Sequence, residues 1–271
     1  MLLKKYRSFS FDTNKFFHFY HSNPIVYRCI WMIVKSFIRC IPNCSYIENL
    51  IRELYITGNS FLYKENDGQL KQLSVNKLYI QINNNFLSYK YEEKLLNKDN
   101  VLHLKLGMDI WGTSPMLCAQ KSIELHNNIS EYLNNLIKSG CKPSGILSYE
   151  EFLSDTKDKE LKKELRTMYN GLGVEGYLAV LGGTYKWQPI NIDPDKLQLL
   201  DIKKVATREI SSAFDVPPIL CSTTDPTFTN YKEARKHFLL DHIIPMSYSI
   251  TRQLNEFIGT FHRVKIPNDI D

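Results

Sequence analysis

The spacing of apolar residues predicts three long helices, each introduced by a proline. In each case an oxygen-bearing side chain precedes the proline: Asn23-Pro24, Ser114-Pro115 and Asp193-Pro194. This order is typical of a helix start, because the side chain accepts a backbone N–H and the proline has no N–H to leave unpaired. The helices are expected over residues 24–41, 115–139 and 194–214. The second would be about 37 Å long at roughly 1.5 Å per residue.

Two further helical patterns carry sequence signals for their ends. A Ser45-x-x-Glu48 capping box predicts the start of a helix that Gly58 would close. The last helix is expected to be capped by Asn230, interrupted at Pro245 and continued to about Ile258.

Short strands are predicted where the period of apolar residues changes. From Ser60 to about Leu106 the chain alternates in short runs, separated by a turn at 66–68 and an Asn-rich turn at 83–85. This segment is expected to be a small antiparallel β module. A hairpin is expected further on, with its turn at Gly182-Gly183. Helices carrying two β modules make an α+β fold, which we expect to be elongated.

Composition and charge narrow the function. The chain has 271 residues, 43% of them hydrophobic and 23% charged, as in a folded globular protein. Its formal charge, 34 − 29 = +5, is too small for a protein that coats nucleic acid generally, so any DNA contact should be local. The six cysteines are expected to be reduced thiols, and the Cys40/Cys44 spacing is a weak zinc signal with no partner pair. We expect no metal and no cofactor.

Residues 25–41 form the longest apolar stretch and raise the question of a membrane. The stretch is shorter than a bilayer span and carries Arg28, Lys35 and Arg39 on one helical stripe. A surface helix is favoured over a helix lying on a membrane. The residues before it lack the features of a secretory signal.

Enzyme signatures are missing from the sequence. It contains no H-E-x-x-H, no G-x-S-x-G and no Walker A loop, and the histidines at 237 and 242 lie about 140° apart on a helix. The alternative of a cytosolic hydrolase or nuclease with a motif-free site stays open, because many active sites carry no motif.

Eight segments in order resemble the portal proteins of long-tailed bacteriophages. They are GNSFLYK (58–64), VLHLKL with GTSPM (112–116), SGCKPSGIL (139–147), YNGLG (169–173), LAVLGGTYKWQPI (178–190), EISSAFDVPPILCST (209–223), TNYKEAR and FLLDHIIPMSYSITRQLNEFI (238–258). The resemblance covers about residues 23–258. It implies a non-enzymatic subunit of a ring, usually of twelve copies, through which double-stranded DNA passes.

The resemblance also implies a division of the chain into parts. The parts are a wing-like region (1–111), a first stem helix (112–141), a clip-like region (142–193), a second stem helix (194–216), a tunnel-like loop (217–229) and a C-terminal kinked helix with its tail (230–271). Fold and function would then be those of a portal-like subunit with long stem helices, a β module and a clip hairpin.

Site residues follow from the same resemblance. The loop facing DNA would present Thr223, Thr224, Thr227 and Thr229, whose hydroxyls suit weak, sequence-independent phosphate contact. On the second stem helix, Asp201, Lys204 and Arg208 share a face, and the two cations would form basic rings or pairs between subunits. Terminase docking would involve Tyr177, Gly182, Gly183 and Trp187 of the clip.

The resemblance implies partners and a location. The partners would be other copies of the chain, expected to form a dodecamer, the terminase large subunit and head-tail connector or neck proteins. They would also include major capsid and scaffold proteins and DNA without sequence specificity, with no membrane. The protein would lie at the capsid vertex of the virion and in the bacterial cytoplasm during assembly. The chain is shorter than most relatives at its wing and crown, so a gene-transfer-particle component and a prophage remnant without activity are alternatives to a working portal.

Overall fold

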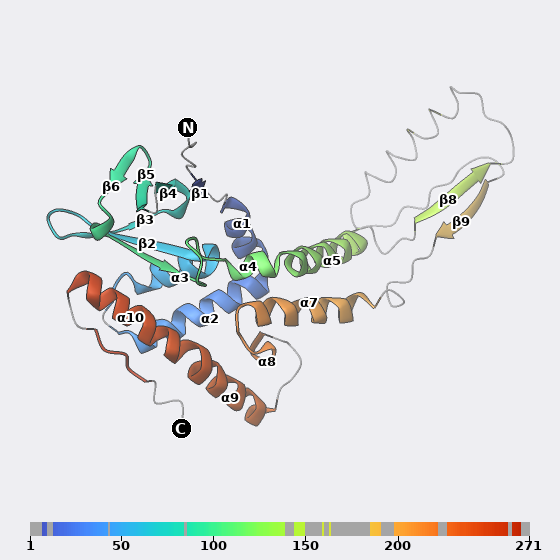
Figure 1. The fold of residues 1–271 in the computed structure, drawn as a ribbon. Coiled ribbons are helices and arrows are strands. Elements are labelled where there is room, and N and C mark those ends of the chain that lie inside the picture. Colours follow the sequence, from blue (N-terminus) through green and yellow to red (C-terminus); the bar gives the residue numbers. More distant parts are fainter. Residues whose placement is uncertain are drawn as a thin grey trace. The chain divides into compact units, whose positions relative to one another are not determined.

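The computed structural model describes residues 7–9, 13–42, 44–83, 86–138, 144–149, 159, 163, 185–190, 198–221, 227–259 and 262–266. They fall into two compact units. The first combines residues 1–126 with 204–271, and the second is residues 127–203. The chain therefore enters the second unit within one helix and leaves it within another (Figure 1).

Three helices begin the first unit: α1 (Asn14–Ser22), α2 (Pro24–Cys40) and α3 (Ile47–Thr57). The predicted start of α2 is confirmed, since the Asn23 side chain accepts the N–H groups of Ile25 and Val26 at 3.0 and 3.1 Å. The capping box predicted for α3 is wrong. That helix begins at Ile47 after Tyr46, whose side chain makes no capping hydrogen bond, so the Ser-x-x-Glu pattern lies beside the start without forming the cap.

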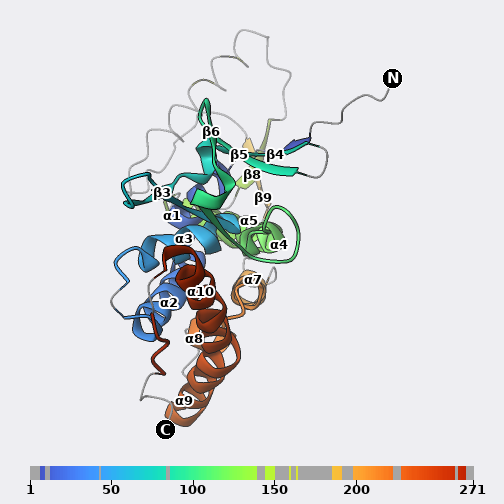
Figure 2. The ribbon, with the colours of Figure 1, turned by 60° about the vertical axis from the view of Figure 1, so that its left-hand side comes forward.

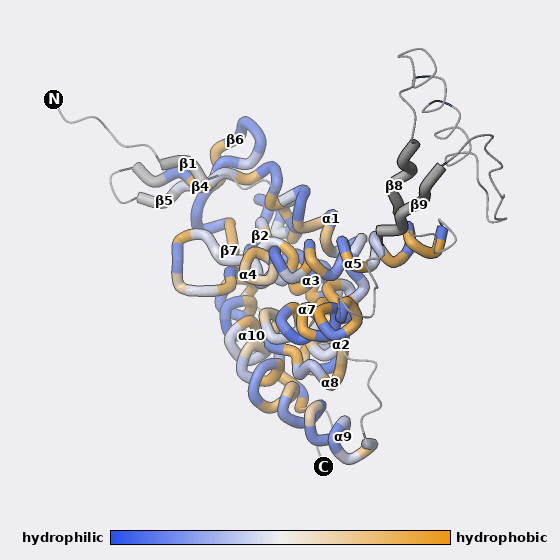
Figure 3. The backbone as a smooth tube through the Cα atoms, turned by 90° about the vertical axis from the view of Figure 1, so that its right-hand side faces the viewer, coloured by the Kyte–Doolittle hydropathy of each residue, from blue (hydrophilic) through white to orange (hydrophobic). Residues whose placement is uncertain are grey.

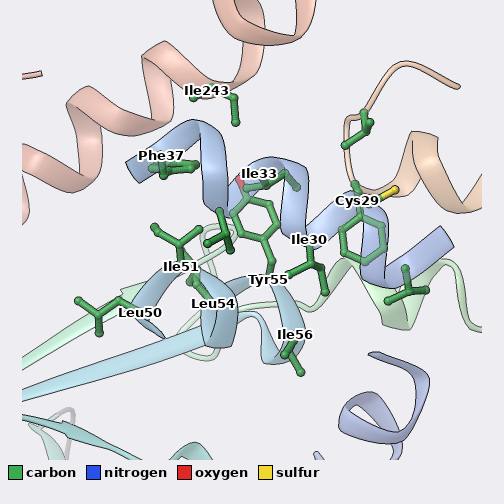
Figure 4. Close-up of a cluster of buried hydrophobic side chains, with 14 of the residues drawn as sticks. Cys29, Ile30, Ile33, Phe37, Leu50, Ile51, Leu54, Tyr55, Ile56 and Ile243 are labelled. Atoms are coloured by element: carbon green, nitrogen blue, oxygen red, sulfur yellow. The ribbon is translucent and has the colours of Figure 1, made fainter. Parts of the chain in front are cut away.

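The apolar faces of α2 and α3 form the centre of the core. Figure 4 shows Ile30, Ile33 and Phe37 of α2 gathered with Tyr55 and neighbouring α3 side chains. These residues are at most 2% exposed. Each large apolar side chain removed from water contributes roughly 1.5–3 kcal/mol, so this contact is a major source of stability.

The expected β module consists of two antiparallel sheets. One has the order β1-β4-β5-β6, formed by β1 (Arg7–Phe9), β4 (Leu78–Asn83), β5 (Phe86–Tyr91) and β6 (Lys94–Leu96). The other has the order β3-β2-β7, formed by β3 (Leu70–Leu73), β2 (Asn59–Lys64) and β7 (Val101–Lys105). All pairs are antiparallel. The second sheet contacts α3 through β2 and α10 through β7, which attaches it to the helices.

Two glycine-containing segments meet where β2 begins. Gly58 has φ of 81° and closes α3, and its carbonyl accepts the N–H of Leu106 at 2.8 Å. A Cβ on Gly58 would lie 2.5 Å from the backbone of Thr113, and one on Gly112 would collide with the carbonyl of Gly58. Two of the segments that carried the family resemblance, GNSFLYK and GTSPM, are therefore in direct backbone contact.

The helix expected to run unbroken from Pro115 is interrupted. Its start is confirmed, because Ser114 Oγ accepts the N–H of Met116 at 3.1 Å. However, α4 (Pro115–Cys118) ends at Ala119, whose φ and ψ of −87° and 3° are not helical, and α5 (Gln120–Lys138) follows. The prediction of one continuous helix is therefore wrong at one residue.

The C-terminal part of the chain is also helical, and its first helix begins in the last residues of the second unit. The helices are α7 (Leu199–Ala213), α8 (Pro218–Cys221), α9 (Phe228–His237), a π-helix (Phe238–Ile243) and α10 (Ile244–Ile258). In Figure 2, α10 lies beside α2, and the two helices are in contact. Figure 3 shows hydrophobic and hydrophilic positions alternating along α10, as expected for a helix with one buried face.

The predicted start and interruption of the last helix both need correction. Its cap is Thr227, whose Oγ1 accepts the N–H of Asn230, so the cap lies three residues before the expected one and the helix begins at Phe228. The regular helix is interrupted over Phe238–Ile243, before Pro245. Proline at 245 stands in the first turn of α10, where its missing N–H is tolerated.

The second unit contains a strand pair. β8 (Ser144–Tyr149) pairs antiparallel with β9 (Tyr185–Ile190), with Leu147 opposite Trp187. The turn at Gly182-Gly183, and the strand expected before it, lie outside the described residues.

Candidate functional site

The turn after α7 is a regular helix C-terminal motif. Val216 N–H donates to the carbonyl of Ser211 and Asp215 N–H to that of Ser212, each at 3.0 Å. These are the two bonds of a Schellman motif. Asp215 takes its left-handed position with φ of 56°, which is more often held by glycine. The turn therefore fixes the direction in which the chain leaves α7.

Asp215 is tied to α3 through a histidine. Its Oδ2 lies 2.8 Å from Nδ1 of His242, and Nε2 of the same ring lies 2.8 Å from the Tyr55 hydroxyl. A neutral His242 that donates from Nδ1 to the carboxylate accepts the Tyr55 proton at Nε2. Burial lowers the pKa of His242 and outweighs the nearby Asp215 carboxylate, and burial raises the pKa of Tyr55. The neutral form is therefore the form near pH 7, and the chain of hydrogen bonds links three elements.

The structure describes half of the threonines predicted to face DNA. Thr223 and Thr224 lie outside the described residues. Thr227 is exposed and caps α9, and Thr229 is exposed in the first turn of that helix. The expected loop 217–229 therefore includes α8 at one end and the start of α9 at the other, and the DNA-facing role of the threonines stays a prediction.

The charged residues predicted on the second stem helix lie on α7. Asp201, Lys204 and Arg208 are exposed, while Ala206 and Ile210 are fully buried. The expected face is thus the solvent side of the helix, and its role in rings or subunit pairs is untested. The expected start at Pro194 lies outside the described residues.

The clip residues are mostly outside the described residues, as Tyr177, Gly182 and Gly183 all are. Trp187 belongs to β9. A docking role for these four residues stays a prediction.

Exposed apolar residues on α5 were not predicted. Leu125 and Tyr132 are each 42% exposed, and their seven-residue separation places them on one stripe of the helix. The apolar side expected for this helix comprised Met116, Ala119, Ile123, Ile129, Leu133, Leu136 and Ile137. The first four are buried, but Leu133 and Leu136 are only half-buried and Ile137 is 70% exposed. A second apolar stripe at heptad spacing was the signal available in the sequence.

Within the described residues, no helix has the length and apolar character needed to cross a membrane. The same residues contain no group of three or more His, Cys, Asp or Glu side chains placed to hold a metal ion.

A comparison with known protein families identifies the family of this chain. Residues 42–269 match the family model described as phage portal protein, which is well over half of the sequence. The chain belongs to the phage portal protein family. Portal proteins are structural proteins and not enzymes, and the α+β portal-like fold expected from the sequence is confirmed.

Relatives of this portal family member include proteins of bacteria and phage. An uncharacterised protein of Rickettsia bellii (strain RML369-C) is 27% identical over 301 residues, covering 93% of this chain and 78% of the relative. A probable portal protein of Streptomyces phage phiC31 is 26% identical over 126 residues, covering 45% of this chain and 28% of the relative.

Solved structures share the portal fold. A chain from the neck of a native gene transfer agent (GTA) particle, computed with C12 symmetry, has a TM-score of 0.65 at 20% identity, covering 97% of this chain and 86% of that one. An HK97-family phage portal protein from Corynebacterium diphtheriae has a TM-score of 0.65 at 13% identity, with 88% of each chain covered.

Proposed function

We propose that this portal family member is the subunit of a closed ring at a capsid vertex, and that the ring is a conduit for double-stranded DNA during packaging and ejection. The family match over residues 42–269 carries this proposal. The fold it shares with a chain from a particle neck that was computed with C12 symmetry supports it. A ring is built from head-to-tail contacts, so each subunit must present two different complementary surfaces.

The exposed apolar side chains of α5 and α7 are suited to such contacts. On α5 these are Leu125 and Tyr132, and on α7 Leu200 and Val205 are 66% and 49% exposed. Apolar side chains that recur along a helix favour burial against another surface. In a ring, these positions would be covered by the adjacent subunits.

The segment between α7 and α9 would be the part of the ring nearest to DNA. Its two ends are fixed, one by the Schellman turn at Asp215 and the other by the Thr227 cap. A fixed base is useful for a loop that must keep its position while DNA slides past. Hydroxyl groups at 223–229 would contact phosphates without holding them tightly.

Other partners follow from the same proposal. The clip-like region 142–193, with Trp187, would dock the terminase large subunit. Neck or head-tail connector proteins, the major capsid protein and scaffold would contact the assembled ring. The protein would be assembled in the bacterial cytoplasm and reside in the virion.

The first experiment is the native mass of the purified protein, with negative-stain images of the same sample. Rings of about twelve subunits with a central hole are expected, in keeping with the usual closed symmetry of homo-oligomers. A compact monomer at every concentration, under conditions where the chain is folded, would overturn the proposal.

The role of the α7 cations is tested in assembled rings. The double variant Lys204→Glu with Arg208→Glu should reduce ring formation or DNA packaging. The double variant Lys71→Glu with Lys98→Glu changes the net charge equally at exposed positions outside α7 and should leave both intact. If both variants assemble and package like the parent protein, the stem-charge assignment is wrong.

A further inference from the structure

A pocket of about 170 Å³ lies between α2 and the segment from α8 to the π-helix. Its rim carries four cationic side chains: Arg28, Lys35, Arg39 and Arg235. Among the described residues that line it, none is acidic. We call it the rim pocket. The first three cations form the stripe that the sequence already showed on α2, and the fold adds the fourth from a helix about two hundred residues away.

The floor of the rim pocket is apolar. Met32 of α2 and Leu220 of α8 line it together with Phe238 and Leu239 of the π-helix. Leu220, Phe238 and Leu239 are nearly fully buried, so the floor is part of the core and is rigid. A cavity of roughly 150 Å³ accommodates a benzene-sized group, so the rim pocket has room for one leucine or phenylalanine side chain.

Two of the cations are held in place by contacts. Nε of Arg28 donates to the carbonyl of Leu220 at 2.8 Å, which holds the guanidinium beside the pocket. Nζ of Lys35 lies 5.2 Å from the centre of the Trp31 ring, a cation–π distance. Cations that are already positioned lose less conformational entropy when an anion binds.

A concave apolar floor under a cationic rim fits an acidic peptide better than a phosphate backbone. The phosphates of duplex DNA would be attracted to the cationic rim but would bury none of the apolar surface on the floor. A peptide with one large apolar side chain between carboxylates uses both, since the side chain fills the floor and the carboxylates reach the rim.

We propose that the rim pocket binds an acidic peptide segment of a partner protein, with one leucine or phenylalanine side chain inserted on the floor and flanking carboxylates paired with the rim. This surface goes beyond the conduit function and does not depend on it. The partner is defined by its chemistry, a short segment of Asp and Glu residues around an apolar anchor.

The test is binding of labelled synthetic peptides to the full-length protein, measured by fluorescence anisotropy. The probe is the peptide GDESFEDG, and its match without the anchor is GDESSEDG. The anchored peptide should bind at least about tenfold more tightly, the usual effect of losing one buried anchor. Its affinity should also fall by about tenfold or more in Lys35→Glu with Arg39→Glu.

A matched variant distinguishes binding in the rim pocket from an effect of the protein's net charge. Lys71→Glu with Lys98→Glu changes the net charge by the same amount at exposed sites on other elements, and should bind the anchored peptide like the parent. Circular dichroism on both variants confirms that they are folded. Native mass measured on the same samples reports the ring separately, so failure of one proposal is distinguishable from failure of the other.

Five results would overturn the proposal. Equal binding of both peptides, or equal loss in both double variants, would mean that charge alone is responsible. Stronger binding of a 20-bp DNA duplex that is lost only in Lys35→Glu with Arg39→Glu would make the rim pocket a phosphate site. Binding to phosphatidylglycerol vesicles with the same dependence would make it a membrane contact. Peptide binding only to dissociated subunits, together with loss of rings in that variant, would identify the occupant as a second copy of the chain.

Discussion

Asn59 is the residue that joins the two backbone segments at the start of β2. It is fully buried, its Oδ1 accepts the N–H of Gly112 at 2.7 Å, and its Nδ2 donates to the carbonyls of Gly112 and Thr57 at 3.0 and 3.2 Å. Because Oδ1 is an acceptor, Nε2 of His103 at 2.9 Å is the donor to it. The Asn59 side chain thus provides hydrogen-bond partners for both the backbone N–H and the carbonyl of buried Gly112.

Gly58 offers a direct test of this junction. Gly58→Ala should lower the free energy of unfolding by about 2–4 kcal/mol, since it adds steric collision with residues 112–114 to the strain of a positive φ. Gly68 has a similar φ of 84° but open space around it, so Gly68→Ala should cost only about 1 kcal/mol. Urea unfolding measures both, and equal losses would show that backbone strain alone matters at Gly58.

His103 predicts a pH dependence of stability. Burial lowers its pKa to about 3, whereas an unfolded histidine titrates near about 6.5. The folded state therefore holds this ring neutral, so its contribution is present above the unfolded pKa and is lost as pH falls towards 3.

The measurement compares urea unfolding at pH 7 and pH 5 in the parent and in His103→Gln, whose amide can still donate to Asn59. Between these values the parent should lose about 1–2 kcal/mol more than the variant. An identical fall in the two proteins would show that other groups account for the pH dependence.

At the scale of elements, the π-helix over Phe238–Ile243 brings the C-terminal helices into contact with the rest of the core. It buries Phe238, Leu239 and Ile243 and places His242 between Tyr55 and Asp215. Hydrogen bonds from i to i+5 span one more residue than those of an α-helix. A π-turn can therefore take up one residue without changing which faces of α9 and α10 are buried.

Two single-residue deletions test that account. Deleting Leu240, 42% exposed in the π-helix, should convert the turn to α-helix and cost less than about 2 kcal/mol. Deleting Tyr248, 52% exposed in α10, should rotate Ile250 and Leu254 by about 100° and cost more than about 4 kcal/mol or prevent folding. Equal loss of thermal stability in the two deletions would contradict a role for the π-helix in absorbing a residue.

At the scale of the whole molecule, the fold divides the chain differently from its linear order. Residues 1–126 and 204–271 form one unit although 77 residues separate them. The wing-like and C-terminal parts implied by the family resemblance are therefore together in the structure's first unit. In a ring, this unit and the unit of residues 127–203 would both repeat around the axis.

Assembly gives a prediction at this scale. Leu125→Asp with Tyr132→Asp, on the exposed stripe of α5, should shift the native mass from rings towards single subunits, because charges replace apolar side chains that the ring would bury. Leu95→Asp with Met108→Asp makes the same change at side chains 65% and 100% exposed, in β6 and in the loop after β7, and should leave rings in place. Intact rings in the α5 variant would remove this stripe from the subunit interface.

The sequence by itself determined the features that depend on neighbours along the chain. Asn23 and Ser114 cap their helices as expected, Gly58 ends α3 in the left-handed conformation, and the strands between residues 59 and 105 follow the alternation of apolar residues. These features are local, since a cap or a turn is decided by the hydrogen bonds and φ values that a few adjacent residues can adopt. Even so, α3 and α9 begin at other residues than their cap signals indicated. A Ser, Asn or Glu at cap spacing therefore marks only one of several possible helix starts nearby.

Only the tertiary structure decided which distant residues meet. The contact between Gly58 and Gly112, the Cys29 and Cys221 sulfurs at 3.4 Å, and the addition of Arg235 to the α2 stripe all join segments far apart in sequence. No periodicity records such pairings, because they depend on how whole helices and sheets pack. The sequence thus determined the starts of α2 and α4 and the run of strands, and packing determined the backbone junction, the π-helix and the rim pocket.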